Sequence, residues 1–223
     1  PKAFLYVFAA LLIIDITAVS YLSGFSLVFF NDRFYKHEFQ KYGIYDRFPE
    51  ADSINSRLLS YLSSGEGREH IDTDFFNQKE KKHLLDVKDM VQKALMSFYL
   101  SIILLIIISA CLAYFIRPNI KRLLPAIMMY SGTAIILPAI ASLSLFIADF
   151  RSLFLYFHEI SFSNNLWILD PATDNLIVMY PRGFFYDFSL SIMYAALSIG
   201  VILLLLGGYL FIRGKRFKKE RAK

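Results

Sequence analysis

The stretch that decides the fold reads ALMSFYLSIILLIIISACLAYFI and runs from Ala94 to Ile116. Its 23 residues carry no charged side chain. Because about 20 helical residues are needed to cross the hydrocarbon core of a bilayer, this stretch is long enough to span a membrane. Three further stretches of 25 to 28 residues, 3–30, 123–148 and 188–212, are as apolar, and the four together contain one charge, Asp15. The sequence therefore predicts an all-α integral membrane protein with four transmembrane helices.

The distribution of positive charge predicts how these helices are oriented. The tail 213–223 has seven Lys and Arg residues against one Glu, and the short link 117–122 has three more. Lys and Arg collect on the cytoplasmic side of membrane proteins, so we expect both termini inside. Segments 31–93 and 149–187, whose net charges are −1 and −3, then lie outside and form an extracytoplasmic cap.

This organisation gives eight consecutive parts. They are a first transmembrane helix 1–30, an extracytoplasmic segment 31–93, transmembrane helix 94–116, a cytoplasmic link 117–122, transmembrane helix 123–148, an extracytoplasmic segment 149–187, transmembrane helix 188–212 and a basic cytoplasmic tail 213–223. The first stretch is longer than a signal peptide, and no small-residue cleavage site follows it, so we expect it to be retained. The sequence pI near 9.2 reflects the inner face and indicates contact with anionic lipid rather than nucleic acid.

Several kinds of catalytic site are not supported. The chain has no G-x-S-x-G motif, and neither His37–Glu38 nor His158–Glu159 is followed by a second histidine at metalloprotease spacing. The single cysteine, Cys111, lies within a predicted span, so the outer segments have no disulfide and no cysteine-based metal site. We therefore predict no metal, no cofactor and no covalent acyl-enzyme.

Four histidines, His37, His70, His83 and His158, all fall in the outer segments. We expect the first two to be ordinary surface residues. His83 is placed on a helix that we expect Thr73 or Asp74 to cap and that runs without Gly or Pro into the 94–116 span. One face of this helix carries four residues with the spacing i, i+4, i+7 and i+11, namely His83, Val87, Met90 and Ala94.

Two acidic residues flank His83 on this helix. Glu80 at i−3 and Asp86 at i+3 can form a simple ion pair with His83, or one of them can fix one ring nitrogen and leave the other as a base. His158 follows an apolar run and is expected at the membrane surface. Trp167 is expected either at the level of the lipid headgroups or stacked on the substrate. Asp15 is either a functional carboxylate or one that hydroxyl groups pair within the helix bundle.

Two motifs in the outer segments resemble one known family. KEKKHLLDVK at 79–88 is similar to the family's E-x-x-H-L-x-D-V-K helix. Phe157–His158 followed by FSNNLWILDPATD at 162–174, and then by Tyr180–Pro181, is similar to its second signature. On these motifs and the order of the spans, the chain resembles the lipoprotein intramolecular transacylases of low-GC Gram-positive bacteria.

This resemblance implies a reaction at the outer leaflet of the bacterial plasma membrane. The sn-2 acyl chain of the diacylglyceryl group on a lipoprotein's N-terminal cysteine moves to the α-amine of that cysteine and gives the lyso-form lipoprotein. The partners are then a diacylated lipoprotein and membrane lipid, without nucleic acid. Because the substrate's own amine is the nucleophile, the protein needs to supply a base, oxyanion donors and a proton for the leaving oxygen.

Position in the chain assigns these roles to residues of the two motifs, because His83 is on the stiffer support with Glu80 and Asp86 in reach, and His158 is in the segment expected to close over the ester. We expect His83 to be the general base and His158 to stabilise the oxyanion or protonate the leaving oxygen. The supporting or orienting residues are Glu80, Asp86, Asn164, Trp167, Asp170 and Asp174. Of these, Asn164 is a second oxyanion donor, and the two aspartates hold the Asp-Pro turn that positions His158.

Two alternatives belong to other classes of protein. The first is a non-enzymatic four-span membrane module that binds a partner through its outer segments. The second, a transporter, is disfavoured because Asp15 is the one charged residue within the predicted spans.

Overall fold

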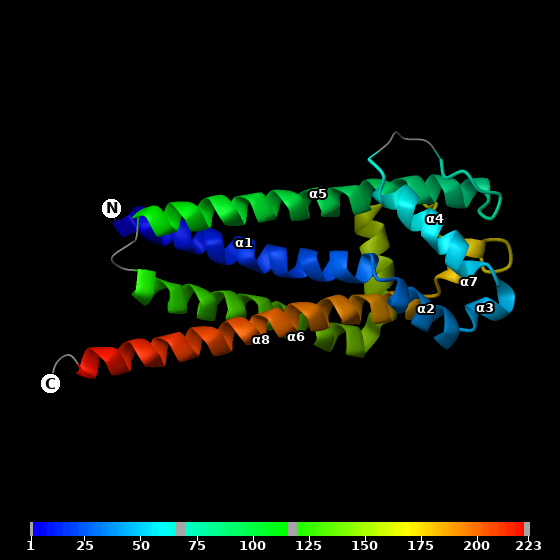
Figure 1. The fold of residues 1–223 in the computed structure, drawn as a ribbon. Helices are drawn as coiled ribbons and strands as arrows, with labels where there is room; N and C mark the ends of the chain where they lie inside the picture. The colour runs from blue at the N-terminus through cyan, green and yellow to red at the C-terminus, as the bar shows by residue number, and fades with distance from the viewer. Residues whose placement is uncertain (1, 66–69, 116–119, 221–223) are drawn as a thin grey trace. The chain divides into compact units, whose positions relative to one another are not determined.

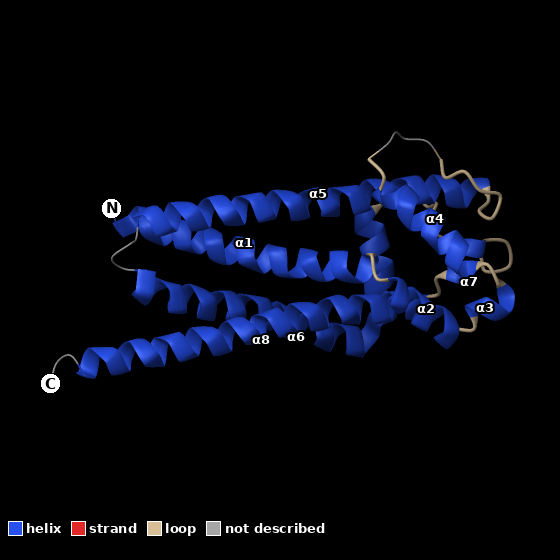
Figure 2. Ribbon diagram, viewed as in Figure 1, coloured by secondary structure: helices blue, strands red, loops and turns tan. Residues whose placement is uncertain are grey.

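The computed structural model describes residues 2–65, 70–115 and 120–220, and all the regular elements in these ranges are helices (Figure 2). In this part of the chain the helices are, in order (Figure 1), α1 (Lys2–Phe29), α2 (Asp32–Lys41), α3 (Ile44–Arg47), α4 (Ala51–Ser63), α5 (Gln78–Phe115), α6 (Ile120–Ser161), α7 (Asn175–Met179) and α8 (Arg182–Glu220). The all-α prediction is confirmed. The apolar run 176–180 falls largely within helix α7.

Four of these helices are long and apolar enough to cross a membrane. The candidate spans in the described residues are Leu5–Phe29, Gln78–Tyr114, Leu123–Ser161 and Arg182–Arg216. Many large apolar side chains on them remain exposed, including Ile106, Leu137 and Leu205, as expected for helices whose outer surface meets lipid. The structure thus confirms four candidate membrane-spanning helices.

The chain folds as two compact units. The four-helix unit comprises residues 1–24, 97–143 and 192–223, and the histidine unit comprises 25–96 and 144–191. Each of the long helices α1, α5, α6 and α8 contributes one part to each unit.

Small residues allow close helix packing in the four-helix unit. A Cβ atom on Gly132 of α6 would lie 2.6 Å from the carbonyl oxygen of Gly200 on α8, so the two backbones touch at this point. Tyr21 of α1 donates a 2.7 Å hydrogen bond to the carbonyl oxygen of Ile135 on α6. Glycine contacts of this kind stabilise helix pairs in membranes, where apolar burial contributes little between helices.

Asp15 lies inside the four-helix unit. Its side chain is buried and is hydrogen-bonded to Ser101 of α5, whereas Oδ2 has no partner in the described part of the chain. The Ser101 contact matches the alternative in which a bundle hydroxyl pairs this carboxylate.

The histidine unit has a core of apolar and aromatic side chains from its helices. Phe39, Phe76 and Met179 are almost completely buried in it. Tyr180 reaches across this core, and its hydroxyl donates a 2.9 Å hydrogen bond to Oδ1 of Asn55 on α4. Segment 31–72, whose fold the sequence did not predict, therefore supplies helices that pack around the start of α5.

The start of α5 differs from the prediction. Oδ1 of Asn77 accepts hydrogen bonds from the second and third backbone N–H groups after it, at 2.9 and 3.0 Å. Glu80 Oε2 accepts the N–H of Asn77 at 2.6 Å, which completes a reciprocal capping box. The prediction of Thr73 or Asp74 as the cap was wrong, because Thr73 caps only the bend before the helix, where its hydroxyl oxygen accepts the N–H of Phe75.

Helix α6 is interrupted at one residue. Asp149 has an extended backbone (φ −159°, ψ 80°), and its Oδ1 accepts the N–H of Ser152 at 3.0 Å. A side-chain acceptor at this position is a typical N-cap. A second helical part therefore begins after Asp149 and carries His158 close to its end at Ser161.

Candidate active site

His83 of α5 and His158 of α6 lie next to each other in the histidine unit, although 75 residues separate them in the sequence. Their ring centroids are 6.3 Å apart, and the ring planes are inclined by 35°. Because both elements belong to the same compact unit, the two side chains meet on supports that are fixed by a common core. Two imidazoles at this distance can act on the same bound molecule.

The ring of His83 is buried, with 5% of the residue exposed. Phe162 packs edge-on against it with ring centroids 5.1 Å apart. Nδ1 of His83 is also buried and has no hydrogen-bond partner in the described part of the protein. Since a charged imidazolium loses its hydration on burial, this environment favours the neutral ring, the form that accepts a proton.

His158 has a different environment. Its Nδ1 lies 2.7 Å from the carbonyl oxygen of Phe154, one helical turn earlier, and a carbonyl can only accept, so Nδ1 carries the hydrogen. Nε2 is therefore the nitrogen that exchanges a proton. The rings of Phe154, Phe162 and Trp167 surround the imidazole at centroid distances of 4.3, 5.6 and 5.2 Å.

The two rings are coupled by charge. Like charges at this separation in a poorly hydrated site repel each other strongly, so the pair holds at most one extra proton. The Phe154 carbonyl stabilises a proton on His158, whereas Nδ1 of His83 has no comparable acceptor. His158 is therefore the better proton carrier of the two, and His83 the more persistently neutral ring.

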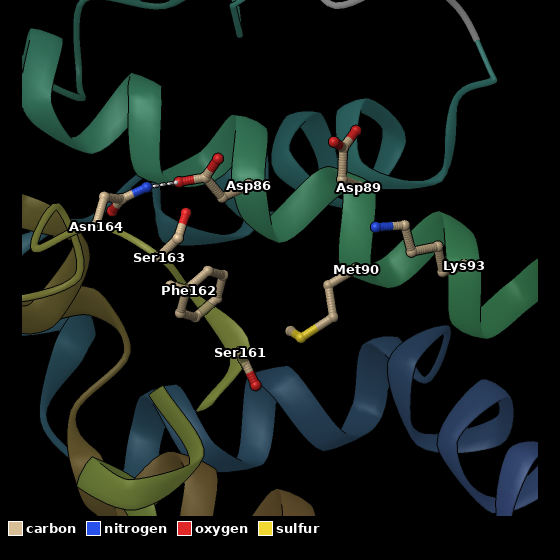
Figure 3. A pocket seen from close by; sticks show the side chains of 8 residues that line it. All are labelled: Asp86, Asp89, Met90, Lys93, Ser161, Phe162, Ser163 and Asn164. Carbon is tan, nitrogen blue, oxygen red and sulfur yellow. Dashed lines mark hydrogen bonds between the residues drawn. The ribbon is translucent and has the colours of Figure 1, made fainter. Parts of the chain in front are cut away.

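Asp86 and Asn164 connect the two elements of the site. The side-chain amide of Asn164 donates a 2.9 Å hydrogen bond to Oδ2 of Asp86 on α5 (Figure 3). Asn164 Oδ1 in turn accepts the N–H of Leu166 at 3.0 Å, which shapes the turn after Phe162. This contact fixes the segment that carries Phe162 and Trp167 to the helix that carries His83.

Glu80 does not contact His83. It is almost fully buried, and its Oε1 accepts the N–H of Leu176 at the start of α7 at 2.6 Å, while Oε2 closes the capping box with Asn77. The structure therefore contradicts the alternative in which Glu80 fixes a ring nitrogen of His83. The reason is that α5 begins only two residues before Glu80, so its carboxylate is used by exposed backbone N–H groups.

Asp174 is the centre of a second polar connection. Its Oδ2 accepts the N–H of Asp170 at 2.7 Å, and its Oδ1 accepts a 2.7 Å hydrogen bond from the Asn77 amide. Lys79 Nζ lies 3.5 Å from Asp174 and donates to the carbonyl oxygen of Ile168 at 2.5 Å. Burial raises the pKa of Asp174, but the hydrogen bonds from Asp170 and Asn77 and the Lys79 charge together lower it below its usual value.

A pocket of about 340 Å³ opens next to Phe162 (Figure 3). One wall is α5 and the other is segment 161–164, and the lining residues are Asp86, Asp89, Met90, Lys93, Ser161, Phe162, Ser163 and Asn164. Phe162 belongs both to this lining and to the contact with His83. The pocket and the histidines therefore share one wall.

His37 and His70 lie at exposed positions. The side chain of His37 is 75% exposed, with Nε2 3.9 Å from Oε1 of Glu38, and His70 is exposed in the segment before α5. Over the described ranges, no three His, Cys, Asp or Glu side chains gather as metal ligands. The histidines that come together are the two that the motifs singled out.

Sequence reasoning missed three contributors to this site. Phe162 touches both histidine rings, Lys79 binds the Ile168 carbonyl, and Asn77 bonds to Asp174. The N-x-x-E pattern of a capping box at 77–80 is a signal that would have identified Asn77. No sequence signal identifies the contact of Phe162 with His83 or that of Lys79 with Ile168, because each joins residues more than 70 positions apart.

Four candidate membrane-crossing helices and a pair of convergent histidines, His83 buried and His158 half-buried, define an integral membrane protein with an acid–base site. Within this class, comparison of the sequence with known families is specific. Residues 7–185 match the family described as lipoprotein intramolecular transacylase Lit, and the chain belongs to this family. It is therefore an enzyme, a multi-pass membrane acyltransferase, and the alternative of a non-enzymatic module is excluded.

Solved structures agree with this fold. The chain is similar to the membrane-integral lipoprotein intramolecular transacylase Lit from Bacillus cereus, with a TM-score of 0.83, 22% identity, and coverage of 97% of this chain and 100% of that chain. Two structures of the same Bacillus cereus protein, each with one histidine replaced, by arginine or by alanine, give TM-scores of 0.77 and 0.76. They are 22% and 23% identical, and each match covers 97% of this chain, with 96% and 97% of the respective relatives. No curated protein matches the chain by sequence.

Proposed function

We propose that this enzyme moves the sn-2 acyl chain of a diacylglyceryl-modified lipoprotein from the glycerol oxygen to the α-amine of the same N-terminal cysteine. The amine forms a C–N bond to the ester carbonyl carbon, the C–O bond to glycerol breaks, and the glycerol oxygen takes up a proton. One proton is released overall when the amine starts as an ammonium. Because donor and acceptor belong to one molecule, positioning supplies a large part of the rate, up to about 7–11 kcal/mol in favourable cases.

His83 is the general base in this proposal. An α-ammonium has a pKa of about 8, so most of it is protonated at neutral pH and cannot attack. The buried, neutral ring of His83 is in the form that accepts this proton, which then passes to His158 and from there to the leaving oxygen, so the pair carries one extra proton at a time. Asp86 lies one turn away on the same helix and stabilises the charge that develops on His83.

His158 is the proton donor to the leaving oxygen or the donor to the oxyanion. Its Nδ1–H contact with Phe154 stabilises the charged ring and leaves Nε2 to point its hydrogen at the substrate. Asn164 is the second oxyanion donor in this proposal. Its amide is bonded to Asp86 in the structure, so it turns toward the substrate only when that contact changes.

The remaining motif residues are positioning residues. Asp170 and Asp174 hold the 168–176 turn against the start of α5, and Glu80 holds α7 in the same place. Trp167 packs on the ring of His158 at 5.2 Å, which favours a role in orienting that ring. None of these groups needs to touch the reacting atoms.

We further propose that both termini are cytoplasmic and that the site faces the outer leaflet of the bacterial plasma membrane. Helix α5 has 38 residues, more than the roughly 20 that cross a bilayer, so its charged first part extends beyond the span. This arrangement keeps 94–116, 1–30, 123–148 and 188–212 as the membrane-crossing segments. It places the histidines where the lipid-modified cysteine of an exported lipoprotein lies.

The observation that carries the proposal is the convergence of two differently held histidines within a member of the transacylase family. The test is to express the protein in a bacterial host that lacks lipoprotein N-acylation and to determine lipoprotein N-termini by mass spectrometry. N-acylated, S-monoacylglyceryl cysteine should appear with the wild type and with His37→Ala, and should be lost with His83→Ala and His158→Ala. Free α-amines in the wild-type sample would refute the proposal.

A further inference from the structure

We propose that the pocket between α5 and segment 161–164 binds the first polypeptide residues that follow the lipid-modified cysteine, and that it prefers positively charged ones. The inference rests on the proposed function, because it concerns the same substrate at the same site. It adds a second recognition element, for the peptide, to the recognition of the lipid.

The pocket has the size and lining of a small recognition site. Its volume of about 340 Å³ lies within the range of roughly 300–1,000 Å³ that is typical of ligand pockets. Met90 and Phe162 give it apolar surface, and two Ser hydroxyls and the Asn164 side chain add polar groups (Figure 3). Such a mixture fits a peptide, which carries both backbone polar groups and apolar stems.

The charges in the pocket select the kind of ligand. Asp86 and Asp89 contribute two carboxylates and Lys93 one ammonium. A net negative lining attracts ligands with cationic or N–H groups and repels the phosphate of an anionic lipid headgroup. The occupant that fits is therefore a peptide rather than a phospholipid.

The pocket adjoins the catalytic pair through a shared residue, Phe162. Asp86 follows His83 by three residues on α5 and lines the pocket, and Phe162 lies between the pocket and both histidine rings. His83 Nδ1 is buried and has no partner in the described protein, so it is available to bond a group of the substrate. A cysteine amine at His83 thus leaves the following residues at the pocket.

The length of the pocket sets how many residues it reads. Asp86 and Lys93 are seven residues apart on α5, which corresponds to about 10 Å along the helix axis. An extended peptide covers about 3.3–3.6 Å per residue. The pocket therefore contacts about three residues after the cysteine, and residues beyond these should have no effect.

The experiment uses three synthetic lipopeptides that share one diacylglyceryl cysteine and differ in the next three residues, which are Lys, Ser or Asp. N-acylation by the purified full chain in a neutral detergent is followed by mass spectrometry, and kcat and KM are determined. We expect KM to rise from the Lys to the Asp peptide by about three- to tenfold, the range for partly exposed charge pairs. The value of kcat should change little, because these side chains do not touch the reacting atoms.

Variants distinguish the pocket from the general charge of the surface. Asp89→Lys should reverse the order of KM values, and Lys93→Gln should widen the difference between the Lys and Asp peptides. Asp72→Lys makes the same change of charge at an exposed position outside the pocket and should leave the order unchanged. If Asp89→Lys does not fold, the wild-type order and Lys93→Gln decide.

Each of the other possible outcomes refutes either the pocket proposal or the proposed function. Equal KM values for the three peptides in the wild type refute the pocket proposal and leave the transacylase reaction intact. An effect of Asp72→Lys as large as that of Asp89→Lys also refutes it. Inhibition by phosphatidylglycerol vesicles that Asp89→Lys alters, with an unchanged peptide order, assigns the pocket to lipid instead. Absence of N-acylation for every peptide refutes the proposed function itself.

Discussion

Nδ1 of His158 donates a hydrogen bond to the backbone carbonyl oxygen of Phe154, 2.7 Å away and one helical turn earlier in α6. This contact fixes the tautomer of the ring and stabilises its charged form. The ring centroid of His83 lies 6.3 Å from that of His158, and the buried Nδ1 of His83 has no such acceptor in the described part of the chain. The two histidines are therefore chemically unequal before any substrate binds.

This inequality predicts different pH responses of the two alanine variants. His83→Ala should lose about 10²–10⁴-fold in rate as a missing base, and His158→Ala about 10²–10³-fold as a missing donor. Raising the pH from 7 to 9 converts most of the substrate ammonium to amine and should restore His83→Ala by about tenfold. His158→Ala should recover much less, because its defect lies at the oxygen. Rates of N-acylation at both pH values test this.

The same variants predict non-additivity. Groups that act on one transition state are not independent, so His83→Ala with His158→Ala should be little worse than the poorer single variant. His37→Ala is the matched control on an exposed histidine and should keep wild-type activity. Equal recovery of both single variants at pH 9 would refute the division of roles, and near-wild-type activity of either would remove that histidine from the site.

Asp174→Asn should lower stability and activity together. The carboxylate is buried, accepts the Asp170 N–H, and pairs with Lys79, so loss of its charge should cost about 1–3 kcal/mol of unfolding free energy. Thermal unfolding in detergent and N-acylation rates are the measurements, with the exposed Asp72→Asn as control. An Asp174→Asn protein with unchanged Tm and no turnover would place Asp174 in the chemistry instead.

Glu38 predicts a pH dependence of stability near neutrality. Burial, together with the hydrogen bond and negative charge of Asp187, raises the pKa of Glu38 from 4.5 to about 7, against the opposing charge of Lys41 at 3.9 Å. The folded state therefore holds the proton more tightly than the unfolded state. This contribution to stability is complete below pH 4.5 and is lost as pH rises through about 7.

The test compares the wild type with Glu38→Gln, in which an amide replaces the protonated acid. Between pH 5 and pH 8, the Tm of the wild type should fall relative to that of Glu38→Gln. Glu50→Gln, an exposed site at the start of α4, should follow the wild type at every pH. Parallel curves for wild type and Glu38→Gln would show that Glu38 does not titrate in this range.

The glycine contact between α6 and α8 gives a prediction for the four-helix unit. Gly132→Ala would bring a Cβ atom within 2.6 Å of the Gly200 carbonyl oxygen, a distance that requires the backbones to separate. We expect a lower Tm, in the range of about 1–3 kcal/mol that overpacking costs. Gly208→Ala on α8 has open space around the new atom and should be neutral. A Gly132→Ala protein as stable as Gly208→Ala would contradict this packing.

The sequence predicted those elements that are specified by the residues of one continuous stretch of the chain. Uncharged stretches such as 94–116 identified the four long helices, because membrane crossing imposes length and composition on each stretch separately. His83 was placed on a helix by its spacing alone. The capping box of Asn77 and Glu80 was equally local and was missed, because Thr73 and Asp74 offered competing cap residues nearby.

The rest depends on contacts between distant segments. The meeting of His83 with His158, the bond from Asn164 to Asp86, and the diversion of Glu80 to α7 each join parts of the chain 75 or more residues apart. Such long-range contacts produce no periodic pattern in the sequence. The family motifs named candidate residues but did not say which of them touch, and that arrangement came only with the fold.

The most direct test of intramolecular transfer from the sn-2 position to the amine follows the acyl chain itself. Two diacylated lipopeptides are mixed in equal amounts, one with a deuterated sn-2 chain and a ¹⁵N-labelled peptide and the other unlabelled, and the N-acylated products are analysed by mass spectrometry. The account predicts that deuterated chains appear as amides only on ¹⁵N peptides, with the sn-1 ester retained. Deuterated chains on unlabelled peptides, or amides that carry the sn-1 chain, would contradict transfer from sn-2 to the amine of the same molecule.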